Sequence, residues 1–169
     1  MTLPAPGIQT GNLCEHVTAT FTRPADTTAY ASADLVANST TAGSVTPMSF
    51  AVGRPNAGGQ IRRVRIVKSG TSAANATFRL HLYSASPTVA NGDNGAFSTD
   101  KAANYNGFVD VTAANTVAFT DGTAVHGAAG IGTEFNFSAA TLYGLLEAKA
   151  AYTPASAEVF TVTLEVIPN

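Results

Sequence analysis

The chain has 169 residues, of which 45% are hydrophobic and only 12% are charged, and its formal net charge is −2. This length favours one domain with a substantial core, and the hydrophobic content argues against a disordered chain. The slight negative charge argues against general nucleic-acid binding, which depends on clustered Lys and Arg side chains. We therefore expect a folded protein with a largely neutral surface and no nucleic-acid partner.

The first residues predict an extended arm. Residues 1–13 contain proline, glycine and polar residues without a periodic apolar pattern, so we expect an N-terminal arm followed by one domain over residues 14–169. Residues 1–7 lack the basic and apolar regions of a signal peptide. No run approaches the roughly 18 apolar residues of a membrane span. We expect synthesis in a cytoplasm and no membrane partner.

Alternating apolar and polar residues predict short β-strands along most of the chain. The clearest case places Phe78, Leu80 and Leu82 on one face of residues 77–84. Residues 159–167 likewise place Phe160, Val162, Leu164 and Val166 on one face. The predicted strands cover residues 17–22, 30–37, 48–52, 61–68, 77–84, 108–111, 117–119, 134–137, 142–148 and 159–167. Short strands separated by turn signals indicate a sandwich or barrel. The predicted fold class is all-β: an antiparallel β-sandwich, in the form of a jelly roll of about eight strands.

One predicted strand, residues 61–68, carries Arg62, Arg63 and Arg65. We expect it to pair with the next strand along the chain, which would bring Arg79 beside these three residues. Two interpretations remain open. The arginines form a cationic patch that contacts an acidic surface on a partner protein or a sister subunit, or they are a solvated strand face whose charge prevents edge-to-edge pairing.

Two long connections, residues 85–107 and 120–132, are rich in small and polar residues. Loops on a rigid scaffold often carry recognition, so both are candidate contact surfaces. Near the first of them, Tyr83, Tyr105 and Phe108 form the best candidate platform of exposed aromatic side chains.

The sequence predicts no catalytic residue, no metal site and no cofactor. His16, His81 and His126 share no ligand spacing typical of zinc sites; we expect His81 to face solvent and His126 to lie in a loop. Cys14 has no helix N-terminus or basic cluster to activate it, and we interpret it as a small, partly buried thiol.

Asp93 lies in the segment NGDNG at residues 91–95. Its surroundings faintly resemble a calcium-binding loop but lack the other acidic ligands. A turn is the preferred interpretation, because Asn, Asp and Gly are the residues that turns favour.

Two blocks of sequence resemble a known family. TRPADTTAY at residues 22–30, followed by DLV at Asp34–Val36, is similar to the opening of small proteins encoded near the head genes of tailed phages. LHLYSASPT at residues 80–88 is also similar to that family, whose members carry a strand that ends in Leu-Tyr before a polar, proline-containing loop. We interpret the first block as a turn and core strand rather than a site.

The resemblance implies a virion protein similar to capsid decoration, or cement, proteins with a jelly-roll fold. Such proteins lie on the capsid exterior, bridge neighbouring subunits of the major capsid protein, and are homo-oligomers, often dimers or trimers. The family offers no catalytic residues. The alternative is a carbohydrate- or receptor-binding jelly-roll module of a phage fibre, since the same fold serves many functions.

Overall fold

The computed structural model describes residues 14–52, 57–137 and 140–168, in which ten strands and two short 3-10 helices occur. In chain order these are β1 (Glu15–Thr22), β2 (Asp34–Val36), β3 (Met48–Ala51), β4 (Ala57–Lys68), β5 (Phe78–Tyr83), η1 (Ala102–Asn104), β6 (Tyr105–Val111), η2 (Ala113–Asn115), β7 (Thr116–Ala118), β8 (Ala124–Phe137), β9 (Thr141–Ala148) and β10 (Val159–Pro168). All strand pairs are antiparallel. The all-β, antiparallel prediction is confirmed, whereas the predicted arm at residues 1–13 lies outside the described residues.

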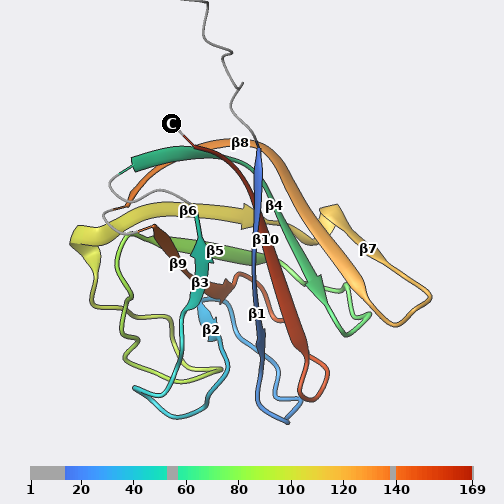
Figure 1. Ribbon diagram of the computed structural model, residues 1–169. Coiled ribbons are helices and arrows are strands. Elements are labelled where there is room, and N and C mark those ends of the chain that lie inside the picture. Colours follow the sequence, from blue (N-terminus) through green and yellow to red (C-terminus); the bar gives the residue numbers. More distant parts are fainter. Residues whose placement is uncertain (1–13, 53–56, 138–139, 169) are drawn as a thin grey trace, which may run out of the picture.

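The strands form two sheets, which appear as two layers in Figure 1. The first, here the β4 sheet, has the strand order β1-β10-β4-β8-β7. The second, the β5 sheet, has the order β2-β9-β5-β6, and β3 also pairs with β9. β2 and β3 lie one after the other along β9, because β2 pairs with Leu146 to Ala148 and β3 with Thr141 to Gly144. The arrangement is that of a β-sandwich.

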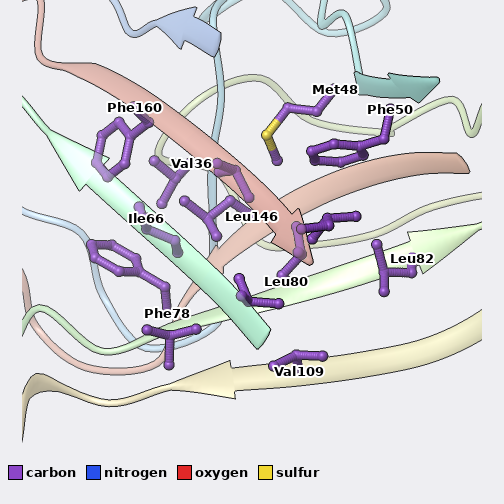
Figure 2. Packing of buried hydrophobic residues seen from close by; sticks show 14 of the residues in the cluster. Val36, Met48, Phe50, Ile66, Phe78, Leu80, Leu82, Val109, Leu146 and Phe160 are labelled. Carbon is purple, nitrogen blue, oxygen red and sulfur yellow. The ribbon is translucent and has the colours of Figure 1, made fainter. Parts of the chain in front are cut away.

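The space between the sheets is filled by apolar side chains from both. In Figure 2, Ile66 and Phe160 from the β4 sheet lie near Phe78, Leu80 and Leu146 from the β5 sheet, and all five are fully buried. Burial of each such side chain contributes about 1.5–3 kcal/mol. The inward positions predicted from alternation in β5 and β10 are confirmed.

The predicted pairing of the arginine-bearing strand was wrong. β4 pairs with β10 and β8, whereas β5 pairs with β6 and β9 in the opposite sheet. Both strands alternate because each has one face on the shared core, and a period of two identifies the face without identifying the neighbour. β4 is also an interior strand, so its arginines do not protect a sheet edge.

Glycine-rich sequence misled the prediction at residues 127–132, which were expected to form part of a loop. They lie inside β8, where residues 127–129 pair with β4 and Gly127 lies opposite Arg65; the register shifts between Ile61 and Arg63. The opposite error occurs at residues 30–37, where only Asp34–Val36 is a strand and Tyr30 forms an isolated bridge with Tyr152. Ala33, just before β2, has a positive φ of 73° that interrupts extended backbone.

The long connection between β5 and β6 lies against the segment around β2. Backbone hydrogen bonds join Asp93 N to Ser39 O (2.7 Å), Asn94 N to Leu35 O (2.9 Å) and Phe97 N to Ala33 O (2.8 Å). The connection is therefore part of the folded body, and it extends over the outer face of the β5 sheet.

Candidate functional site

The candidate site lies on the outer face of the β5 sheet. Arg79, His81 and Tyr83 alternate with the core residues of β5 and therefore point away from the core. His81 and Tyr83 are nevertheless 8% and 2% exposed, so the expectation that His81 faces solvent was wrong. Phe97, from the connection between β5 and β6, stacks on the His81 ring with 4.1 Å between centroids and 18° between planes.

Both ring nitrogens of His81 have hydrogen-bonding partners. Nε2 lies 2.7 Å from Oε2 of Glu147 on β9, and Nδ1 lies 3.0 Å from the hydroxyl oxygen of Tyr105. Lys149 Nζ donates to the other carboxylate oxygen of Glu147 at 3.0 Å. Burial lowers the pKa of His81, and Glu147 opposes that shift. With both nitrogens engaged, the imidazole is suited to positioning Tyr105 rather than to acid–base chemistry or metal ligation.

Arg79 fixes an aromatic side chain at the surface. Its Nε and Nη2 donate to the two carboxylate oxygens of Asp110 at 2.7 and 2.9 Å, in the paired geometry that suits a guanidinium. The hydrogen bond to Arg79 lowers the pKa of Asp110. The guanidinium carbon also lies 3.7 Å from the ring centroid of Phe108, a cation–π contact.

Two of these rings are open to a partner. Tyr105 is 39% exposed and Phe108 is 44% exposed. Tyr83 is buried beneath them, with its ring 5.2 Å from that of Tyr105 and its hydroxyl 3.2 Å from Thr99 Oγ1. We call Arg79, His81, Tyr83, Tyr105 and Phe108 the aromatic patch. It offers two exposed, side-chain-supported rings beside a charged pair.

The structure separates the site residues that the sequence pointed to. Arg79, Tyr83, Tyr105 and Phe108 come together in the aromatic patch, whereas Arg62, Arg63 and Arg65 lie exposed on β4 in the other sheet. The predicted proximity of Arg79 to these three arginines was wrong, because β4 and β5 belong to different sheets. Arg63 instead forms an ion pair with Glu165 on the neighbouring strand β10, at 3.1 Å.

Sequence reasoning missed the contributions of Phe97 and Glu147. The alternation of β9 could have placed Glu147 on the outer face, but nothing local links it to His81, 66 residues earlier. Phe97 reaches the sheet from an irregular segment, where hydrophobic periodicity gives no signal.

The opening block contributes to the interior. Arg23 has a fully buried side chain whose Nε donates to the Tyr30 hydroxyl at 2.8 Å and whose Nη2 donates to Asp93 Oδ2 at 3.0 Å. The Tyr30 hydroxyl and the Ala37 backbone amide donate to Asp93 Oδ1, both at 2.7 Å. Asp93 lies in a turn, as predicted, and both its oxygens accept hydrogen bonds from protein donors.

A groove of about 510 Å³ lies between β1 and the segment that leads into β3. It is lined by Ala19, Thr20, Phe21, Thr22, Asn38, Thr46, Pro47, Met48 and Ser49. None of these side chains is ionisable near neutral pH, so the lining offers no general acid, base or charged ligand.

Comparison with protein-family models, curated proteins and solved structures finds no match to this chain. Within residues 14–52, 57–137 and 140–168, no helix has the length and hydrophobicity that a membrane crossing requires.

Proposed function

We propose that this protein is a structural component of a tailed-phage virion that binds the outside of the capsid and cements neighbouring subunits of the major capsid protein. The aromatic patch is the observation that carries the proposal. Tyr and Arg are enriched among the residues that dominate protein interfaces. Tyr105 and Phe108 are exposed yet held by His81 and Arg79, so less conformational freedom is lost when a partner covers them.

The fold proposal is a jelly roll. It is supported by the pairing of the first strand with the last, β1 with β10, and by a chain that passes repeatedly between the two sheets. Four core strands in each sheet, β1-β10-β4-β8 and β2-β9-β5-β6, fit two interlocked Greek keys. This is the fold that the resemblance of residues 22–36 and 80–88 implies.

A cement role also fits what the resembling blocks do in the fold. Arg23 and Tyr30 are buried and hydrogen-bonded, so the similarity of the first block reflects architecture. The role requires a rigid body and a contact surface, and needs no catalytic group. We further propose a homo-oligomer, a dimer or trimer, made in the host cytoplasm and located on the capsid exterior; light scattering on the purified protein tests the oligomer.

The test is cosedimentation of the purified protein with expanded capsids that lack it. We expect saturable binding and a higher temperature of capsid disruption, because a ligand of the assembled shell stabilises that shell by mass action. Phe108→Ser should weaken binding. Phe119→Ser is the matched control, since Phe119 is 47% exposed but follows β7 in the other sheet. The proposal would be refuted if the protein did not bind and if capsids with and without the added protein were equally resistant to heat.

The arginines of β4 supply a second candidate contact with the capsid or a sister subunit. Arg63→Glu combined with Arg65→Glu reverses two exposed charges without disturbing the buried side of the strand. If capsid binding and the oligomeric state are unchanged, the arginines form a solvated strand face and make no such contact.

A second candidate function is carbohydrate or receptor binding by a phage fibre module. The two exposed rings beside Arg79 and Asp110 favour it, because sugars stack on aromatic faces and form hydrogen bonds with charged groups. Burial of Tyr83 leaves a smaller platform than the sequence indicated. A glycan array with the unmodified protein and Phe108→Ser distinguishes the two functions, since the cement role predicts no bound glycan.

A further inference from the structure

Three side chains with different donor atoms meet where β1 begins. The Cys14 thiol sulfur, a His16 ring nitrogen and a Glu165 carboxylate oxygen all lie within 4.8 Å of one another. The sequence predicted no metal site, because local spacing reveals only two of the three donors. Cys14 and His16 are close in the chain, whereas Glu165 is 149 positions away from His16. Cys14 was also expected to be partly buried, whereas it is exposed.

The sheet itself brings the group together. Cys14 and His16 are two residues apart in extended chain, so their side chains point to the same face. His16 and Glu165 are direct partners in the pairing of β1 with β10. Cross-strand partners have Cβ atoms only about 5 Å apart, so modest side-chain rotation closes the three donors around one ion.

A neighbouring residue orients the carboxylate. Arg63, opposite Glu165 on β4, forms an ion pair with it in which Nε lies 3.1 Å from Glu165 Oε2. One oxygen of Glu165 is thereby held by the sheet while the carboxylate remains within reach of Cys14 and His16. Partners of this kind commonly hold metal ligands in position. A hollow of about 190 Å³ beside His16 and Glu165, lined also by Arg63, Arg65 and Thr163, leaves room for water.

We propose that Cys14, His16 and Glu165 form a zinc-binding site on the outer face of the β4 sheet. One thiolate, one imidazole and one carboxylate are ligands that Zn²⁺ accepts, whereas Ca²⁺ and Mg²⁺ prefer oxygen ligands alone. The thiolate and carboxylate together balance the charge of the ion. Three protein ligands leave a coordination position for water or for a donor from another molecule.

The site is independent of the aromatic patch, which lies on the other sheet, so its test does not involve capsids. The 169-residue chain is freed of metal, kept reduced with a phosphine, and titrated with Zn²⁺ against a chromophoric chelator. We expect one Zn²⁺ per chain. Cys14→Ser, His16→Gln and Glu165→Gln should each weaken binding about tenfold or more, since loss of even an outer partner costs about 10–100-fold.

Glu15→Gln is the matched control, because it removes a carboxylate next to both ligands in sequence but on the alternate side of the strand; it should leave zinc affinity unchanged. Co²⁺ provides a second measurement, since a thiolate ligand gives a charge-transfer band that Cys14→Ser should abolish. Thermal melting confirms that each variant is folded. The proposal would be overturned if the unmodified protein failed to bind one Zn²⁺, or if Cys14→Ser and His16→Gln bound Zn²⁺ as tightly as the unmodified protein.

Discussion

Arg23 and Asp93, 70 residues apart in the chain, form an ion pair of 3.0 Å in which both side chains are fully buried. Arg23 lies just after β1, and Asp93 lies in the connection between β5 and β6. The pair therefore joins the opening block to the connection whose Phe97 stacks on His81 of the aromatic patch. Tyr30 adds hydrogen bonds to both partners, and burial together with the Asp93 carboxylate raises the pKa of its hydroxyl.

Arg23→Met should strongly destabilise the protein. Removal of one partner leaves Asp93 as a buried charge without its counter-ion, which typically costs about 3–5 kcal/mol. Urea denaturation followed by circular dichroism measures the free energy of unfolding. Lys101→Met is the control, because it breaks the exposed pair with Asp100 in the same connection, where about 1 kcal/mol or less is at stake. Similar losses in the two variants would contradict a structural role for the buried pair.

Gly92→Ala should displace the connection that carries Asp93. A Cβ atom at Gly92 would overlap the backbone carbonyl of Thr40, which has little freedom to move. Overpacking of this kind costs about 1–3 kcal/mol. Gly127→Ala, where a Cβ would meet nothing within 4 Å, should change the free energy of unfolding by no more than about 1 kcal/mol. Equal stability of the two variants would count against the close packing at Gly92.

The sequence predicted what depends on local periodicity. Alternation identified the core faces of β5 and β10, because a strand with one face on a core repeats every two residues. It failed for the partner of β4, which is chosen by the whole sheet. The prediction of a loop around Gly127 was also wrong. Glycine usually indicates a turn, whereas here the long strand β8 continues through it.

The candidate site was half visible in the sequence. Arg79, Tyr105 and Phe108 stand out as charged or aromatic residues on or beside polar strand faces. Their supports, His81 with Glu147 and the covering Phe97, come from segments that meet only in the folded chain. The proposed zinc ligand Glu165 was hidden for the same reason, because only the pairing of β1 with β10 brings it to His16.

His126 should make the protein less stable in mild acid. Expected in a loop, it is instead fully buried in β8, with Nδ1 hydrogen-bonded to Thr116 Oγ1, and Nε2 has no partner among the described residues. Burial, with repulsion from Lys68, lowers its pKa from 6.5 to about 4. The unfolded chain therefore takes up a proton between these values while the folded protein does not, so stability is lost as the pH falls through this window.

His126→Leu removes this effect. At pH 8 this substitution should change the free energy of unfolding only modestly. Between pH 6.5 and 4, the free energy of unfolding of the unmodified protein should fall by up to about 3 kcal/mol more than that of the variant, at 1.36 kcal/mol for each unit of pKa shift. Urea denaturation at several pH values measures the difference, and the pH 8 value corrects for the change in packing. Parallel pH profiles would show that His126 does not carry the acid sensitivity.

Lys68, Glu158 and Tyr152 form a second buried network, and it should be replaceable by apolar side chains. Lys68 Nζ donates to Glu158 Oε1 at 3.0 Å and to the Gly70 carbonyl at 2.7 Å, and the Tyr152 hydroxyl donates to Glu158 Oε2. Lys68→Met alone leaves Glu158 unpaired and should cost about 3–5 kcal/mol. The triple variant Lys68→Met, Glu158→Met, Tyr152→Phe buries no unpaired charge.

We expect the triple variant to recover most of the loss, because a buried ion pair is often no more stabilising than apolar groups of similar volume. Tyr152→Phe alone is the reference, and it should cost about 1 kcal/mol for one lost hydrogen bond. Thermal and urea denaturation of the four proteins complete the comparison. If the triple variant is no more stable than Lys68→Met, the ion pair and its hydrogen bonds stabilise the fold in a way that apolar packing does not reproduce. Arg23 would be a poorer subject for this test, since it donates to three backbone carbonyls, those of Pro24, Asp26 and Ala155, whereas Lys68 donates to one. No apolar side chain supplies those hydrogen bonds.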